Sequence, residues 1–385
     1  MPFRQRELMD ERIRFVVAAS RGERSLAALC REFGISRPTG YLWLDRYRES
    51  GSVAALRERS HRPRRMPRLT PSSVVDQVVS LRLAHGWGAR KLRVLLSRRG
   101  VTLSESTINR VLKRQGLVYD REVAGTAPRR FERAAPNELW QMDFKGPYRL
   151  TTGRCVPLSI IDDHSRYAIG LFALDNQLTD TVHQALVNRF ERYGVPEAIL
   201  TDHGIPWWGN SNGHGLTRLS VSLIRQGIRL CFSGLRHPQT QGKVERFHRT
   251  ISEMVRHHGR PATLSSWQTR LDDFRNEYNQ LRPHEALDLD VPAARYRPSH
   301  RPYQPDPTDW EYPPGANVVR LNQQGLLPWQ RKRYFVCEAL ANEYVEVNEC
   351  QQKLLIRFRH MWIREIDRIT GRSATLIDKE QNPYV

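Results

Sequence analysis

Three acidic residues stand out because of the secondary structure expected around them. Asp143 lies within an alternating segment typical of a strand, on the face opposite three large apolar side chains. Asp202 directly follows a short apolar run, and Glu245 falls in the first turn of a helix introduced by Gly242. A strand centre, a strand end and the start of a neighbouring helix can bring three carboxylates together at the edge of a sheet.

Carboxylates that cluster in this way repel one another unless a cation neutralises them. Oxygen ligands select Mg²⁺ or Mn²⁺. Two such ions about 3.5–4 Å apart can activate a water or a 3′-hydroxyl and stabilise the leaving oxygen of an in-line displacement. Each acid also has a structural interpretation, because Asp is common at strand ends and the helix dipole favours Glu near a helix start.

The charge of the chain is strongly basic and unevenly distributed. The formal net charge is +20, with a pI near 10.3. Residues 1–135 hold 29 Lys and Arg against 13 Asp and Glu, whereas residues 136–385 hold 32 against 28. Such an Arg-rich segment attracts a polyanion through phosphate contacts and counterion release. This concentration favours nucleic acid as the partner over a merely basic soluble protein.

A helix-turn-helix DNA-binding domain is expected over residues 1–60. Gly34 permits the turn between a helix that begins near Ser25 and a third helix capped by Ser36. Generic helix pairs give the same pattern, and the basic setting favours the DNA-binding interpretation. The side chains of the third helix expected to contact DNA are Arg37, Thr39, Trp43 and Arg46.

A basic linker over residues 61–69 leads to a second helix-turn-helix domain over residues 70–118. The linker prolines forbid a helix, and its arginines are either solvated or track phosphates in the minor groove. In the second domain Pro71 occupies a first helical position, and Ser104 and Ser106 precede the last helix. The predicted DNA contacts of linker and last helix are Arg62, Arg64, Arg65, Thr107, Asn109, Arg110 and Lys113.

After a linker over residues 119–135, residues 136–297 are expected to form an α/β core with a mixed sheet. Three consecutive strands precede alternating helices and strands, which indicates a sheet covered by helices. A further linker over residues 298–316 leads to short, closely spaced strands, expected to form a small β-barrel over residues 317–385. Its basic positions, suited to a supporting DNA contact, are Arg331, Lys332, Arg333, Arg357 and Arg359.

Four motifs, taken together and in this order, resemble the integrase-core transposases of bacterial insertion sequences. They are Trp140-Gln141-Met142-Asp143, Ile161-Asp162-Asp163-His164-Ser165-Arg166, Thr201-Asp202-His203-Gly204, and His237-Pro238-Gln239-Thr240-Gln241-Gly242-Lys243-Val244-Glu245-Arg246. The resemblance covers residues 136–295 and implies a ribonuclease H-like core. It also implies a catalytic and metal-binding triad of Asp143, Asp202 and Glu245 that holds two Mg²⁺ or Mn²⁺ ions.

The resemblance places further residues beside DNA, and it has departures. His237, Gln239 and Lys243 match the stretch that leads into the glutamate. Relatives often carry a Lys or Arg two turns after the glutamate, where this chain has Ser252, so Arg249 is expected to take that role. The position after the second Asp is His203 here, where many relatives have Asn.

Two aromatic features keep alternative interpretations. Trp207 and Trp208, in an insertion between the second and third acids, either pack in the core, which is favoured, or stack on a flipped base. His164 either caps a tight turn, which is favoured, or shuttles a proton.

The sequence therefore predicts a transposase that binds the terminal repeats of an insertion sequence, cleaves them and transfers the 3′-hydroxyl ends into target DNA. Because two ends must be joined, a dimer or larger assembly on double-stranded DNA is expected. A bacterial cytoplasmic, nucleoid-associated protein without a membrane span is expected, with five unpaired cysteines. The alternatives are an inactive DNA-binding regulator derived from a transposase, and a ribonuclease H-like nuclease that cuts without strand transfer.

Overall fold

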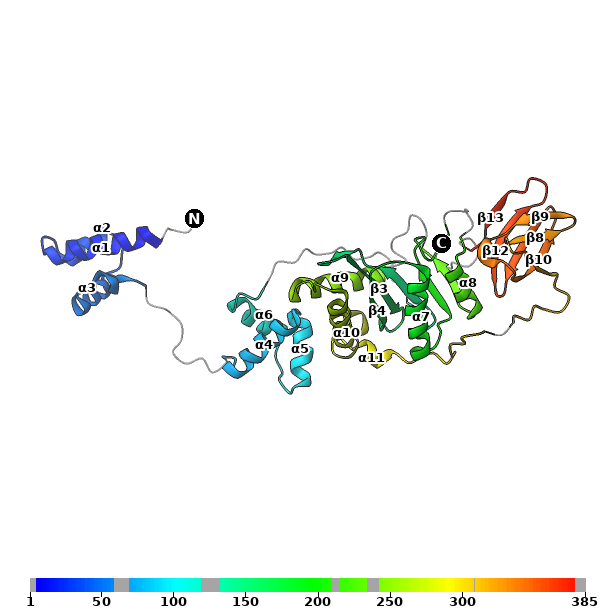
Figure 1. Cartoon of the computed structure of the whole chain (residues 1–385). Coiled ribbons are helices and arrows are strands. Elements are labelled where there is room, and N and C mark those ends of the chain that lie inside the picture. Colours follow the sequence, from blue (N-terminus) through cyan, green and yellow to red (C-terminus); the bar gives the residue numbers. More distant parts are fainter. Residues whose placement is uncertain are drawn as a thin grey trace. The chain divides into compact units, whose positions relative to one another are not determined.

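A computed structural model describes residues 5–58, 69–118, 132–209, 215–233, 242–307 and 309–377. The chain divides into two compact units, Met1–Thr70 and Pro71–Val385, which are described separately (Figure 1). No helix among the described residues is both long enough and apolar enough to cross a membrane. The predicted contact residues outside this part of the chain are Arg62, Arg64, Arg65, His237 and Gln239.

The first unit is a small helical domain, as expected. Ser36 accepts a hydrogen bond from the backbone N–H of Thr39 and so caps the third helix. Gly40 faces the core, because a Cβ there would lie 2.5 Å from the sulfur of Cys30 and 2.9 Å from the ring of Phe15. The elements are α1 (Gln5–Arg21), α2 (Leu26–Glu32), α3 (Arg37–Ser50) and the 3₁₀ helix η1 (Val53–Leu56).

Three further helices begin the second unit and pack around Leu92, Leu96 and Ile108. Ser104 caps the third of them by accepting from the N–H of Thr107. The helices are α4 (Ser72–His85), α5 (Ala89–Arg98) and α6 (Glu105–Arg114). The helices expected in this part of the sequence are therefore present in the structure.

The centre of the second unit is a six-stranded mixed sheet. Strand β1 pairs antiparallel with β3 and parallel with β5, while β4 pairs with β3, and β6 with β5. This arrangement confirms the expected α/β core with a mixed sheet. The strands are β1 (Trp140–Phe144), β2 (Tyr148–Arg149), β3 (Arg154–Asp162), β4 (Ala168–Leu174), β5 (Ala198–Thr201) and β6 (Arg229–Phe232).

Helices cover both faces of this sheet. Because side chains alternate along a strand, Ile160 joins the apolar cluster on one face and Ile161 the cluster on the other. The first face is covered by α7 (Thr179–Tyr193) and α8 (Arg218–Arg225). The second face is covered by α9 (Gly242–His258) and α10 (Leu264–Gln280).

The C-terminal region is an open sheet rather than the expected barrel. Strands β7 and β13 end a five-stranded sheet, and β8 and β9 form a separate hairpin, so the strands described do not close into a barrel. Short helices, η3 (Glu285–Leu287), α11 (Pro292–Arg295) and η4 (Glu338–Leu340), complete the described elements. The strands are β7 (Val318–Arg320), β8 (Leu326–Trp329), β9 (Lys332–Phe335), β10 (Tyr344–Cys350), β11 (Lys353–Phe358), β12 (Met361–Asp367) and β13 (Ser373–Thr375).

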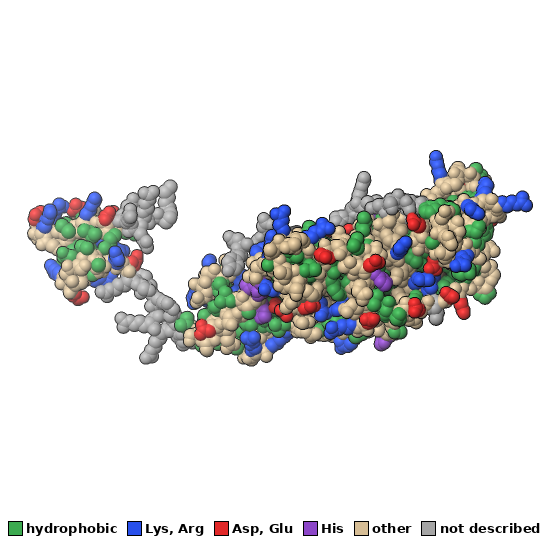
Figure 2. All heavy atoms as spheres, in the orientation of Figure 1, with side chains coloured by type: hydrophobic (Ala, Val, Ile, Leu, Met, Phe, Trp, Pro, Cys, Tyr) green, Lys and Arg blue, Asp and Glu red, His purple; other side chains and the backbone are tan. Residues whose placement is uncertain are grey.

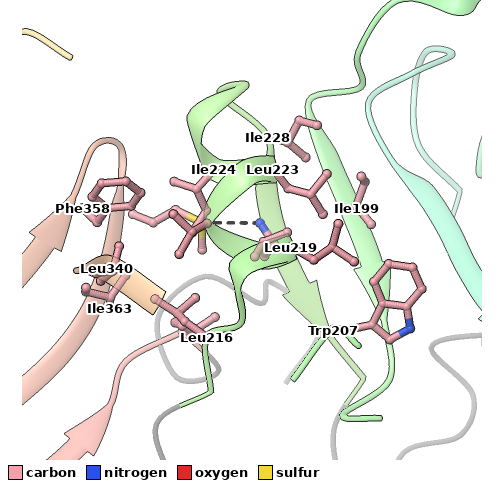
Figure 3. Close-up of a cluster of buried hydrophobic side chains, with 14 of the residues drawn as sticks. Ile199, Trp207, Leu216, Leu219, Leu223, Ile224, Ile228, Leu340, Phe358 and Ile363 are labelled. Atoms are coloured by element: carbon pink, nitrogen blue, oxygen red, sulfur yellow. Dashed lines mark hydrogen bonds between the residues drawn. The ribbon is translucent and has the colours of Figure 1, made fainter. Parts of the chain in front are cut away.

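This sheet shares its hydrophobic core with helix α8 (Figure 3). Leu340, Phe358 and Ile363 lie on the side of α8 that carries Ile224, and the N–H of Leu230 donates to the sulfur of Met361. The core sheet and the C-terminal sheet are therefore packed as one body.

Lys and Arg side chains are spread over the visible surface, with acidic side chains among them (Figure 2).

Candidate active site

The three predicted catalytic acids lie on adjacent elements. Asp143 occupies β1 opposite Ser159 of β3, and Asp202 follows the last residue of β5, the parallel neighbour of β1. Glu245 lies in the first turn of α9, which packs on β1 and β3. Asp143 and Asp202 are half-buried and Glu245 is exposed.

The charges of these acids act on one another. Burial raises the pKa of Asp143 to about 6, and the charges of Asp202 and then Glu245 push it in the same direction. The N–H of Phe144 donates to the Asp143 carboxylate at 2.8 Å and opposes the rise. The three carboxylates therefore share one electrostatic neighbourhood whose negative charge is incompletely neutralised by the protein.

The carboxylate oxygens of these three acids are the type of ligand that Mg²⁺ and Mn²⁺ prefer. Asp202 accepts a hydrogen bond from the N–H of Gly204 at 3.0 Å. A Cβ at Gly204 would lie 3.0 Å from both carboxylate oxygens of Asp202, so glycine keeps the space beside that group open. Within the described residues, no three or more His, Cys, Asp and Glu side chains are arranged to hold a metal ion.

His248 belongs to this site and was missed by the sequence analysis. Its Nε2 lies 3.0 Å from the hydroxyl of Ser159, and its Nδ1 lies 3.6 Å from Oδ2 of Asp143. Burial, together with the charge of Lys145, lowers the pKa of His248 to about 4, so its ring is neutral at pH 7. Its position three residues after Glu245, on the neighbouring part of the helix surface, was the available sequence signal.

A buried polar network fixes the start of α9. The carboxylate of Asp163, fully buried, accepts from Gln141 at 2.8 Å and pairs with Lys243 Nζ at 2.5 Å. The N–H of Val244 donates to the Gln141 side chain at 3.4 Å. Burial lowers the pKa of Lys243 to about 8, although the charge of Asp163 opposes this. Lys243 therefore holds α9 to the sheet, and its predicted DNA contact stays a prediction.

The turn between β3 and β4 is also held by buried acids. Asp162 accepts hydrogen bonds from the N–H of Asn137 and from the N–H and hydroxyl of Ser165. Nδ1 of His164 lies 2.8 Å from the carbonyl oxygen of Arg133, which joins the turn to the segment before β1, and the two interpretations of His164 stay predictions.

The tryptophan pair after Asp202 packs inside the protein. Trp207 is 3% exposed and its ring lies 5.9 Å from that of Phe144. Trp208 is half-buried, with its ring 4.6 Å from His203 and 4.8 Å from Phe232. The favoured core-packing interpretation is therefore the one the structure supports.

The predicted DNA-contact residues of the two helical domains belong to α3 and α6, which do not carry any of the three acids. On α3, Arg37 is exposed and Thr39 half-buried, while Trp43 lies between the guanidinium groups of Arg12 and Arg46 at 4.1 and 4.8 Å. On α6, Thr107 is half-buried, and the exposed predicted contacts are Asn109, Arg110 and Lys113.

The basic residues of the C-terminal sheet divide into two groups. Arg331, Lys332 and Arg333 are exposed on the β8–β9 hairpin. Arg357 forms an ion pair with Glu346, and Arg359 is buried and donates to the carbonyl oxygen of Arg225. The expectation that Arg359 faces DNA was therefore wrong, because its guanidinium holds the C-terminal sheet to the core.

Family models match most of the N-terminal and central regions. Two models described as integrase core domain match residues 133–238 and 226–292. A helix-turn-helix domain model matches residues 11–64, and a homeodomain-like domain model matches residues 39–112.

Proteins of mobile elements resemble the chain. A 31.7 kDa protein of insertion element IS407 from Burkholderia multivorans is 26% identical over 234 residues, covering 55% of this chain and 76% of that protein. The transposase of transposon Tn552 from Staphylococcus aureus is 29% identical, covering 44% of this chain and 39% of that protein. An insertion element IS136 protein from Agrobacterium tumefaciens is 30% identical over 151 residues, covering 36% of this chain and 71% of that protein. The chain belongs to the integrase-core transposases of insertion elements.

Proposed function

We propose that this transposase binds the terminal repeats of its insertion element, hydrolyses a phosphodiester to expose a 3′-hydroxyl, and joins that hydroxyl to target DNA. The observation that carries the proposal is the placement of Asp143, Asp202 and Glu245 on adjacent elements, where burial and then the charges of Asp202 and Glu245 raise the pKa of Asp143. An arrangement that brings unneutralised carboxylates onto two adjacent central strands and the helix packed on them suits a cation and a phosphodiester better than it suits folding.

Asp143, Asp202 and Glu245 would hold two divalent ions, Mg²⁺ or Mn²⁺. When bound, such ions polarise phosphate oxygens and lower the pKa of a water or hydroxyl nucleophile. The chain itself positions the ligands: β1 and β5 fix the two aspartates, and the network around Asp163 fixes the start of α9 and hence Glu245. His248 contacts Asp143 as a neutral ring and limits the orientations of that carboxylate.

The DNA would be bound first by the two helical domains. Their family matches, the excess of Arg in residues 1–135 and the exposed side chains of α6 support this assignment. Since transposition joins two element ends, we propose that two or more copies assemble on DNA.

The proposal is tested by incubating the chain with Mg²⁺ and labelled duplex carrying the element's end, and following cleavage and strand-transfer products. Asp143→Asn, Asp202→Asn and Glu245→Gln should each lower both products by on the order of 10³-fold, because each removes a group that stabilises charge in the transition state. Binding of the end should be unchanged. Glu191→Gln, an exposed acid on α7 across the sheet, is the matched control and should leave both products unchanged.

The same assay separates the alternatives. Cleavage by the wild-type chain without joined product would favour a nuclease, and end binding without cleavage would favour an inactive regulator. Loss of DNA binding in all three triad variants would contradict the assignment of these acids to chemistry.

A further inference from the structure

The second helical domain is docked on the catalytic core through contacts between residues far apart in the sequence. His85 Nδ1, at the end of α4, lies 3.1 Å from a carboxylate oxygen of Glu277 in α10. Nε2 of His257, at the end of α9, donates to the carbonyl oxygen of Leu83 at 2.7 Å. Leu281 packs against the apolar cluster of α4, α5 and α6. These contacts join α4–α6 to α9 and α10 within one compact unit (Figure 1).

The docking interface is closely packed at the turn after α4. A Cβ at Gly86 would lie 3.3 Å from Nδ1 of His257, and the guanidinium of Arg282 lies 5.8 Å from the ring of Trp87. Burial and the charge of Arg282 lower the pKa of Lys91 to about 7, so this amine is enclosed at the same junction. These contacts place the end of α4, and with it α6, beside α9 and α10.

A groove of about 830 Å³ lies between the docked domain and the core. Asn109 of α6 lines one side, and Thr250 and Arg256 of α9 line the other. Asn109 is one of the exposed side chains of the predicted recognition helix, and Arg256 is exposed on α9. The surface of α6 that would read DNA therefore faces the same space as the far end of the helix that carries Glu245.

The exposed side of α9 connects this groove to the candidate active site. Glu245, Arg249 and Arg256 follow one another at four and seven residues, a spacing that places them on one side of the helix. All three are exposed. From Glu245 to Arg256 the helix rises by roughly 16 Å, which corresponds to about five base pairs at 3.4 Å each.

We propose that the docked domain acts as a spacer that sets where the element's end is cut. The duplex runs from α6, across the groove and along the exposed side of α9, with Arg249 and Arg256 contacting its phosphates. The interface between α4 and α9–α10 then holds the base pairs read by α6 at least about half a helical turn from the phosphodiester at Glu245, because α6 lies across the groove from Arg256. This inference rests on the proposed function and adds to it the spacing between recognition and cleavage.

Substrate length tests the spacing without altering the protein. The segment read by α6 is first mapped as the footprint that is lost in the Asn109→Ala, Lys113→Ala double variant. Labelled duplexes then carry insertions of one to ten base pairs between that segment and the terminal nucleotide. We expect the cut to keep its distance from that segment, or to be lost. A cut that stays at the original terminal nucleotide at an undiminished rate would overturn the proposal.

Two protein variants test whether the docked interface or the connecting chain sets the position of the cut. Six Gly and Ser residues inserted after Gly125, between α6 and the core, should leave the cut at its original position because the interface sets it. His257→Ala combined with Glu277→Ala should spread the cut over several positions, with retained folding checked by thermal denaturation. A cut that spreads on lengthening the connection, and stays sharp when the interface is weakened, would overturn the proposal.

Salt dependence tests the phosphate contacts along α9. Arg256→Ala should lower the slope of log Kobs against log salt for end binding by about 0.9, the value for one phosphate contact. Arg218→Ala, an exposed arginine of α8 across the sheet, is the matched control and should not change the slope. Equal slopes for wild type and Arg256→Ala would remove α9 from the proposed path. These measurements use the Asp143→Asn chain, so they are independent of cleavage, whereas a wild-type chain that cuts no substrate would refute the proposed function itself.

Discussion

Two groups of acids lie at neighbouring places in the same sheet and differ in how the protein treats their charge. Asp162 and Asp163, at the end of β3, are fully buried, and backbone N–H groups, Ser165, Gln141 and Lys243 satisfy their oxygens. In the second group, Asp143 and Asp202 each accept one backbone hydrogen bond. The part of the chain that is described shows no hydrogen bond or ion pair to Glu245.

The comparison separates acids that stabilise the fold from the acids that we propose bind divalent cations. Burial alone does not distinguish them, because the structural pair is the more deeply buried of the two groups. The partners of the carboxylates do: Asp163 pairs with the half-buried ammonium of Lys243, whereas no cationic side chain pairs with Asp143 among the described residues, and burial and the charge of Asp202 raise its pKa. A buried charge without compensation is costly, and persists in a folded protein mainly where chemistry requires it.

The largest change in stability is expected on removing the charge of Asp163. Asp163→Asn deprives Lys243 of its buried carboxylate and should lower the free energy of unfolding by about 3–5 kcal/mol, the cost of breaking a buried pair from one side. Urea denaturation at pH 7 measures it. A loss below about 1 kcal/mol would show that the network around Asp163 does not hold the fold.

At the candidate active site, removing a carboxylate charge is expected to raise the free energy of unfolding instead of lowering it. Asp143→Asn should raise the free energy of unfolding of the metal-free chain at pH 7 by roughly 1–3 kcal/mol, since a raised carboxyl pKa is a destabilisation of about 1.4 kcal/mol per unit. The folded chain binds this proton more tightly than the unfolded chain. The free energy of unfolding of wild type should therefore equal that of the variant below pH 4 and fall below it as the pH rises from about 4 to 6. Above about pH 7 it should stay lower by a constant amount.

Denaturation series of both chains in EDTA, from pH 4 to pH 8, measure this difference. The prediction fails if the two stability curves are parallel throughout. Such a result would mean that Asp143 is compensated in the same way as Asp163, and the contrast between the two groups would disappear.

A smaller effect, on the affinity for the metal ion, is expected from changing His248, which contacts Asp143. His248→Ala removes a neutral ring that lies against both Asp143 and Ser159, and should weaken the affinity for Mg²⁺ or Mn²⁺ by about 10- to 100-fold, as loss of a ligand-orienting contact typically does. His248→Gln, which can keep the contact with Ser159, should recover part of the affinity. Unchanged metal affinity in both variants would assign His248 to packing alone.

Much of the fold was predictable because local rules agreed with it. The helices over residues 89–98 and 179–193 and the strand at 140–144 follow from apolar periodicity with clear caps or breaks. Strands β8 and β13 give no clear apolar alternation, because β8 contains Pro328 and β13 consists of Ser373, Ala374 and Thr375. The barrel was not confirmed, since short strands in sequence order do not specify whether the ends of a sheet meet.

The candidate site was predictable only in part. Motif order pointed to the three acids, but the sequence could not show which neighbouring acids are neutralised, because the partners of Asp163 come from different elements. The docking of α4 on α10 depends on a contact between His85 and Glu277, which are 192 positions apart. Contacts of this range follow from packing of the whole unit, and no local pattern encodes them.

Metal binding tests the central claim most directly, namely that Asp143, Asp202 and Glu245 are left uncompensated in order to hold divalent cations. The measurement is Mn²⁺ binding to the full chain without DNA, followed by electron paramagnetic resonance of the free ion, in wild type, the three triad variants and the Glu191→Gln control. The account predicts binding by wild type and the control that each triad variant weakens by at least about tenfold. Equal binding by all five proteins would contradict it.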